Sequence, residues 1–332
     1  MAKQRIPYFD FLRGAAILMV VAIHTFDGSL AFDSPASCAA IAVRQLLNCA
    51  VPVFLAVSGF FLSRKLLVTR GGRIAFWRKQ VPRVYVPCLL WSLPLYVLAL
   101  YGGSRSWLTS TAMLLLCGFS VYYFIALIIQ YYLLLPVIQR CCSRRWVAAA
   151  AAVSAVSIVA VTCVVTVRGH ALPLLVYAGP FPVWLVFFVL GVHLGRSRRD
   201  YSPWLPLLLA VVFAAAAYGE AWWLHSLHGA GGYGIKPTAF CYSAAVVLLL
   251  FSRRTEEAWG RVAGWLRPVC WLGGLSFGVY LCHCYVIQLA DRFCPVSGWF
   301  AKWLLVTAVT CLLLAAARAV LPRRLHAWLG LR

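Results

Sequence analysis

Residues 8–26 read YFDFLRGAAILMVVAIHTF and decide the fold, because an apolar run of this length predicts a membrane-spanning helix. The run contains two ionisable side chains, Arg13 near its start and His24 near its end. Eleven helical steps of about 100° come within about 20° of three whole turns, so both side chains share one face, about 16 Å apart along the axis. Ionisable groups inside a membrane usually face a bundle interior or a polar pathway. The stretch therefore predicts a membrane helix that carries a functional site on one face.

Two acidic residues flank this pair. Asp10 lies three residues before Arg13 and is predicted to pair with its guanidinium at the membrane boundary. Asp27 lies three residues after His24, where it either accepts a proton from the imidazole and fixes its tautomer or is a solvated charge at the helix end. Both members of the pair also have a purely structural interpretation. Arg13 could extend its side chain to the cytoplasmic headgroups, and His24 could be a hydrogen-bonded packing residue. Their occurrence together favours the functional interpretation.

The composition extends the membrane prediction to the whole chain. Hydrophobic residues make up 63% of the 332 residues, charged residues make up 11%, and the mean hydropathy is +0.86, which is more apolar surface than a soluble core of this size buries. We expect an all-α polytopic membrane protein, one domain over residues 1–332, with about ten transmembrane helices and both termini cytoplasmic. The expected spans are 10–31, 40–62, 81–101, 118–139, 146–167, 175–195, 203–224, 236–252, 268–289 and 299–321.

The net charge of +22 follows the same topology. With a cytoplasmic N-terminus, 24 of the 30 Lys and Arg residues fall on the cytoplasmic side of the expected spans, as the positive-inside rule demands. The six on the outer side are Arg44, Arg105, Arg168, Lys236, Arg292 and Lys302. This distribution leaves no support for nucleic-acid binding, and the expected partner of the whole chain is the lipid bilayer.

Residues 63–87, SRKLLVTRGGRIAFWRKQVPRVYVP, form the most basic segment, and we expect a cytoplasmic loop over 64–83. Anionic headgroups would attract such a loop. Alternatively, it is a docking surface for a phosphorylated cytosolic donor, because arginine binds phosphate in a bidentate manner. In this second interpretation Trp77 anchors the segment at the interface or stacks on a nucleotide base. The donor-binding candidates are Arg70, Arg73, Arg78, Arg83 and Trp77.

Other residues are expected to form an acceptor cavity in the outer half of the membrane. The candidates are Tyr122, Tyr123, Glu220, Ser276, Tyr280 and His283. The last three share one helix face, and His283 lies at a depth similar to that of His24, which suggests one polar cavity or a hydrogen-bonded structural pair. The two adjacent tyrosines also suit an interfacial aromatic belt, and an interfacial carboxylate such as Glu220 needs no function.

Two motif matches fail on their context. Cys282-His283-Cys284 looks like a metal cluster, but adjacent helix positions point about 100° apart and do not converge on one ion. Residues 229–234, GAGGYG, match GxGxxG, but they lie in an outer loop with no preceding strand, which excludes dinucleotide binding. We therefore expect neither a metal site nor a tightly bound cofactor.

Four segments together resemble the membrane-bound acyltransferase family 3, and they run through nearly the whole chain: FDFLRGAAILMVVAIHT (9–25), VPVFLAVSGFFL (51–62), FWRKQVPRVYVP (76–87) and LSFGVYLCH (275–283). The resemblance, to the short standalone type, implies O-acylation, most often O-acetylation, with cytosolic acyl-CoA (acetyl-CoA) as co-substrate. It also implies an extracytoplasmic glycan or lipid-linked sugar as acceptor and a multi-pass location in the bacterial inner membrane. Arg13 and His24 match the family's essential Arg-x10-His pair, and Arg70 and Arg73 match its Arg-x-x-Arg element. Tyr122-Tyr123 departs from the tryptophan frequent there, so the acceptor is undefined.

The chemistry of acyl transfer agrees with this resemblance. A base must take the proton of the acceptor hydroxyl, and His24 suits that role because the unperturbed pKa of an imidazole lies near neutrality. Arg13 lies nearer the cytosol and is better placed for the donor's phosphate or pantetheine arm than for the oxyanion. A covalent acyl-histidine intermediate is an alternative. The competing function is a transporter or flippase for a lipid-linked sugar, although the internal repeats common in transporters are not visible here.

Overall fold

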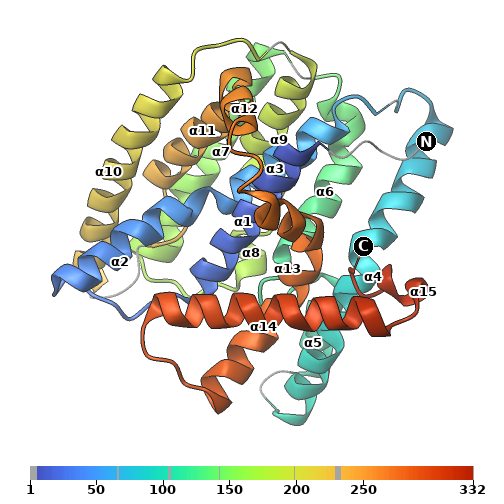
Figure 1. Cartoon of the computed structure of the whole chain (residues 1–332), viewed down its shortest axis with the longest axis vertical. Helices are drawn as coiled ribbons and strands as arrows, with labels where there is room; N and C mark the ends of the chain where they lie inside the picture. The colour runs from blue at the N-terminus through green and yellow to red at the C-terminus, as the bar shows by residue number, and fades with distance from the viewer. Residues whose placement is uncertain are drawn as a thin grey trace.

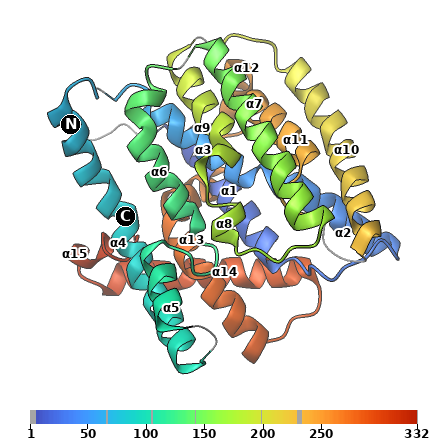
Figure 2. The same cartoon turned by 180° about the vertical axis from the view of Figure 1, so that it is seen from behind.

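The computed structural model describes residues 6–65, 67–103, 106–141, 143–197, 199–228 and 233–331. All regular secondary structure in these ranges is helical, which confirms the all-α prediction (Figure 1, Figure 2). The helices are α1 (Pro7–Thr25), α2 (Pro35–Leu46), η1 (Leu47–Cys49), α3 (Ala50–Leu62), α4 (Arg70–Tyr101), α5 (Trp107–Leu115), α6 (Tyr123–Ile138), α7 (Arg144–Val161), η2 (Thr162–Val167), α8 (Leu174–Tyr177), α9 (Phe181–Arg196), α10 (Trp204–His228), α11 (Pro237–Phe251), α12 (Arg253–Gly260), α13 (Arg267–Phe293), α14 (Trp299–Val320) and α15 (Arg323–His326). Most of the GxGxxG match lies outside the described residues, as do Lys3, Arg5, Arg105, Arg198 and Arg332 of the charge count.

Every expected span contains a helix, but the first helix ends at Thr25 and not at residue 31, because Phe26 is already extended. Among the described residues, seven segments are long and apolar enough to cross a membrane: α1, α2 through α3, α4, α7 with η2, α10, α13 and α14. The other three expected spans are the shorter apolar helices α6, α9 and α11. A polytopic membrane protein is thus supported, while the count of ten spans and the side on which the termini lie stay predictions.

The basic segment is mostly helix rather than the expected loop. Helix α4 begins at Arg70, where the Thr69 hydroxyl caps it by accepting a hydrogen bond from the Gly72 amide at 3.1 Å. It continues to Tyr101 through Pro82, Pro87 and Pro94. Proline is tolerated in membrane helices, where neighbouring groups satisfy the freed backbone. The basic residues from Arg70 onward are therefore held on a rigid helix that is continuous with the expected third span.

The fourth expected span starts later than residue 118. Cys117 and Ser120 have φ values of 54° and 52°, a left-handed conformation that a continuous α-helix excludes. Helix α6 consequently begins at Tyr123, and residues 117–122 form an irregular turn against α13. The short helix α5, with the sequence WLTSTAMLL, precedes this turn and was not expected from the sequence.

Helices α1 and α13 pack extensively against each other at the centre of the molecule (Figure 1). A Cβ atom at Gly14 would stand 1.9 Å from the Val269 carbonyl oxygen, and one at Gly273 would stand 1.8 Å from the Asp10 carbonyl oxygen. Only glycine permits two membrane helices to approach so closely. This packing fixes the register between the two helices that carry His24 and His283.

The second close pair is α3 with α9, where Gly191 packs against the Ala56 backbone. Their C-terminal ends meet the end of α6: Gln139 Nε2 donates to Leu62 O at 2.8 Å, and Arg196 Nε donates to Ser63 O at 2.8 Å. Arg199 pairs with Glu256 at 2.9 Å nearby. The helix ends gathered here belong to the face that the charge distribution predicts to be cytoplasmic.

Candidate functional site

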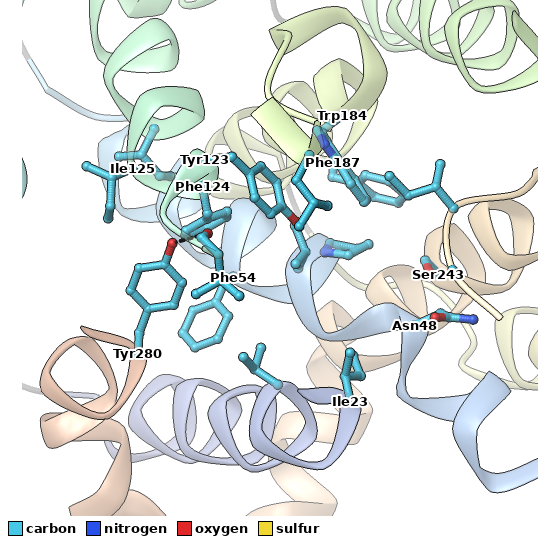
Figure 3. A pocket seen from close by; sticks show the side chains of 18 of the residues that line it. Ile23, Asn48, Phe54, Tyr123, Phe124, Ile125, Trp184, Phe187, Ser243 and Tyr280 are labelled. Atoms are coloured by element: carbon cyan, nitrogen blue, oxygen red, sulfur yellow. Dashed lines mark hydrogen bonds between the residues drawn. The ribbon is translucent and has the colours of Figure 1, made fainter. Parts of the chain in front are cut away.

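A cavity of about 460 Å³ lies among the central helices and is lined mainly by α1, α3, α6, α9, α11 and α13 (Figure 3). Figure 3 shows Tyr280 and Ile125 at one side of it and Asn48 and Ser243 at the other. Much of its wall is apolar and aromatic, for example Phe54, and a few polar groups converge on it, as is common in small-molecule binding sites.

Arg13 and His24 both line this cavity, as the helical periodicity predicts. Val20 of α1 lies between them on the same wall. Arg13 NH1 donates to Asp10 Oδ1 at 3.0 Å, which confirms the predicted pairing, and its guanidinium lies 4.9 Å from the centre of the Phe61 ring. The guanidinium is thus held at one end of the cavity, and the imidazole stands three helical turns further along.

His283 lies directly behind His24, with the two ring centres 5.4 Å apart. It is fully buried and is not part of the cavity wall. Its Nδ1 lies 2.8 Å from Tyr280 O and 2.9 Å from Val279 O, and because a carbonyl oxygen only accepts, Nδ1 carries the hydrogen. In the described part of the chain His24 makes no hydrogen bond, so its ring nitrogens remain available to molecules in the cavity.

The family model for acyltransferase family 3, an acyltransferase domain, matches residues 6–319. The chain belongs to this family. No curated protein and no solved structure matches it. As in the resemblance noted above, the family's Arg-x10-His pair corresponds to Arg13 and His24, and the structure shows that in this family member the two residues share one cavity.

Of the two interpretations of Asp27, the structure agrees with the solvated charge at the helix end, and the expected hydrogen bond with His24 is not formed among the described residues. Its carboxylate accepts from Ser29 N at 2.9 Å and from Ser29 Oγ at 2.6 Å, and it is exposed. These hydrogen bonds hold the pKa of Asp27 below its usual value. The physical reason is that α1 ends at Thr25 and Phe26 is extended, so the i, i+3 relation with His24 is lost.

The acceptor candidates divide into two groups. Tyr123, Ser276 and Tyr280 line the cavity, and Tyr280 OH donates to Val121 O at 2.6 Å. Tyr122 is fully buried outside the wall, with its hydroxyl donating to Leu281 O at 2.5 Å. Its assignment to the cavity is therefore corrected, because the turn at 117–122 directs it into the packing against α13.

Glu220 and His283 also lie outside the cavity wall. Glu220 accepts hydrogen bonds from Thr238 N at 2.9 Å and from the Thr238 hydroxyl, so it caps the beginning of α11. His283 supports His24 from behind. Both assignments to the cavity are corrected, since these groups are occupied by structural hydrogen bonds.

None of the five donor-binding candidates lines the cavity. Arg70, Arg78 and Arg83 are exposed on α4, and Arg73 is partly buried beside Thr69. Trp77 is tied to α6, because its Nε1 donates to Tyr132 O at 2.8 Å. Donor binding by these residues stays a prediction.

Tyr132 connects the basic helix to the cavity. Its side chain lines the cavity and lies within electrostatic range of both Arg13 and Arg83. The ring of Phe76 packs edge-on against it with centres 5.8 Å apart. Of the two arginines, only Arg13 lines the cavity; Arg83 is exposed on α4 outside the wall.

Two residues of the cavity wall were not predicted from the sequence to be site residues. Arg44 and Lys236 were counted only as outer-face charges, yet both line the cavity and are 7% and 1% exposed. A signal existed: each falls inside an expected span, where ionisable residues are by default functional candidates. Counting them toward topology obscured that signal.

Proposed function

We propose that this protein transfers an acyl group, most often acetyl, from cytosolic acyl-CoA to a hydroxyl of an extracytoplasmic or lipid-linked carbohydrate. The observation that carries the proposal is the single cavity that holds both Arg13 and His24 of a family 3 acyltransferase. The two groups lie about 16 Å apart along one helix face. That spacing suits a long, extended donor arm with its charged end at Arg13 and its thioester at His24.

His24 acts in this proposal as the general base. Its ring nitrogen takes the proton of the acceptor hydroxyl while the hydroxyl oxygen bonds to the acyl carbon. The carbon–sulfur bond then breaks, and the CoA thiolate receives the proton from the imidazole, which leaves His24 neutral again. Attack by the imidazole itself, through an acyl-histidine, is a second route with the same overall balance. The burial of His283 behind the ring keeps His24 directed toward the cavity.

The donor's phosphates are proposed to bind beside Tyr132, between Arg13 on the cavity wall and Arg83 on the exposed face of α4. Arginine forks match phosphate oxygens in pairs, so two guanidinium groups near Tyr132 suit a diphosphate. Arg70, Arg73 and Arg78 on the exposed first turns of α4 would add charge for the nucleotide end. The hydrogen bond from Trp77 Nε1 to Tyr132 O holds α4 against α6, next to the cavity.

The acceptor is proposed to enter from the opposite end, where Tyr123 and Tyr280 supply polar groups beside aromatic surface. The short family members that the chain resembles include the inner-membrane enzyme that O-acetylates enterobacterial common antigen, so that glycan is one candidate. A location in the bacterial inner membrane belongs to the same proposal.

The test is transfer of radiolabelled acetyl groups from acetyl-CoA to a glycan fraction by purified protein in lipid nanodiscs. His24→Ala is expected to lower the rate by about 10²- to 10⁴-fold, which is the usual contribution of a general base. His170→Ala, at an exposed histidine, serves as the matched control and is expected to retain the wild-type rate. Full activity in the His24 variant would refute the assignment. Glycan translocation without any acyl transfer would favour the flippase instead.

A further inference from the structure

The cavity contains two buried cations at the end opposite Arg13. Arg44 lies in the last turn of α2, and Lys236 directly precedes α11. Both side chains line the cavity. Asn48 and Ser243, two neutral polar residues of the same wall, lie on one side of the cavity in Figure 3. The outer end of the cavity is therefore a polar, positively charged compartment.

Arg44 has less compensation than a buried arginine normally receives. One of its nitrogens donates to Asn48 Oδ1 at 2.6 Å, and its guanidinium lies 6.0 Å from the centre of the Phe26 ring. A guanidinium carries five N–H donors, and among the described residues no carboxylate lies within ion-pair distance of Arg44. A buried charge without a counter-charge is strongly unfavourable, so this site is suited to an anion.

Lys236 contributes to the same field but is better satisfied. Its Nζ donates to Gln45 Oε1 and to Ala217 O, each at 2.7 Å, and Glu220 lies within electrostatic range. The cavity wall nevertheless includes three cationic side chains, Arg13, Arg44 and Lys236, and no aspartate or glutamate among its described residues. Arg13 is compensated by Asp10 and Lys236 by Glu220, both outside the wall, so Arg44 is the cation of this wall for which no ion pair is found among the described residues.

We propose that the outer end of the cavity, around Arg44, binds an anionic group of the acceptor, either a carboxylate on the sugar or a phosphate of its lipid carrier. The identity of this ligand as the acceptor rests on the proposed acyl transfer; the anion site itself does not. Arg44 packs on Phe26, two residues beyond His24, so an anion held there positions the adjoining sugar next to the imidazole. The site therefore selects an acidic acceptor over a neutral one.

The test measures ligand binding to the intact protein in nanodiscs, with thermal shift titrations that need no turnover. One pair of probes is methyl β-glucuronide against methyl β-glucoside, which tests a carboxylate. The other pair is farnesyl phosphate against farnesol, which tests a phosphate. The anionic member of one pair is expected to bind roughly tenfold or more tightly, as one charge-assisted hydrogen bond provides.

Variants assign that preference to the guanidinium. Arg44→Gln is expected to abolish the preference, Arg44→Lys to retain part of it, and Arg168→Gln, at an exposed arginine outside the cavity, to leave it unchanged. Equal binding of charged and neutral probes to the wild type would overturn the proposal, even if Arg44→Gln failed to fold. An undiminished preference in Arg44→Gln would overturn it as well. Charge-selective binding without acetyl transfer would reject the proposed function and keep the anion site.

Discussion

Replacing Gly14 by alanine tests whether the contact between α1 and α13 positions the site. The new Cβ would stand 1.9 Å from the Val269 carbonyl oxygen, whereas ordinary contact begins at 3.4 Å. The two helices must therefore separate locally by roughly 1.5 Å, the difference between these distances. The backbone of Val269 belongs to α13 and has no rotamer with which to avoid the methyl group.

The separation has two expected consequences. Overpacking of this kind destabilises a protein by about 1–3 kcal/mol, so the midpoint of thermal unfolding should fall. The same shift loosens the contact between His24 and His283, whose ring centres are 5.4 Å apart across these helices, and a misplacement of about 1 Å costs on the order of 10²-fold in rate. Acetyl transfer by the purified variant and its unfolding midpoint in nanodiscs measure both effects.

Gly219→Ala is the matched control, because Gly219 lies in helix α10 with no atom within 4 Å of an added Cβ. That variant should retain wild-type activity and gain slightly in stability from the better helix propensity of alanine. Gly273→Ala, 1.8 Å from the Asp10 carbonyl oxygen, should reproduce the Gly14 effect, and the double variant should lose less than the sum. A Gly14→Ala protein with unchanged rate and midpoint would refute the proposed dependence of the site on this packing.

Three further predictions concern the donor-binding candidates and Asp27. Removing the guanidinium groups of Arg70 and Arg73 together should raise the KM for acyl-CoA several-fold and leave kcat nearly unchanged, because these groups are proposed to bind the donor equally in the ground state and the transition state. Steady-state kinetics measure both constants. An altered acceptor preference at constant KM would show that the two arginines do not bind the donor. Asp27→Asn should leave acetyl transfer unchanged, because its carboxylate bonds to Ser29 and not to His24. The lowered pKa of Asp27 contributes a small stability that is fully present above a pH of about 4 and is lost as the pH falls through the folded-state pKa. Acidification below a pH of about 4 should therefore lower the unfolding midpoint of the wild type more than that of Asp27→Asn.

The sequence predicted those features that depend on local helical geometry. The three-residue spacing of Asp10 and Arg13 gives their ion pair, and the eleven-residue spacing of Arg13 and His24 puts both on the cavity wall. Hydropathy located a helix at every expected span, because apolar length is a local property. The all-helical fold and the principal pair of site residues followed from these rules alone.

Features that depend on helix ends or on distant partners were not predictable in this way. Asp27 was misassigned because the periodicity stops at Thr25, one residue after His24. Tyr122 and Glu220 were misassigned because their partners, Leu281 and Thr238, are remote in sequence or lie across a loop. Such contacts depend on tertiary packing, which overrides any inference from residue type.

The cationic end of the cavity illustrates the same limit. Arg44 and Lys236 are 192 residues apart, and nothing in the sequence connects them to each other or to His24. Their position inside expected spans was a usable signal of function. Only the packing of η1 against α1, α2 and α11, which brings both side chains to the cavity wall, turned that signal into a site.

The central claim is that donor and acceptor meet at His24 inside one cavity. The most direct measurement is a cryo-electron microscopy structure of the protein with a non-hydrolysable thioether analogue of acetyl-CoA. We predict the analogue's acetyl carbonyl at about 3–4 Å from the His24 ring, near-attack range for a reacting group, and its phosphates next to Arg13 and Arg83. An analogue bound elsewhere, with the cavity empty and His24 unapproached, would contradict the account.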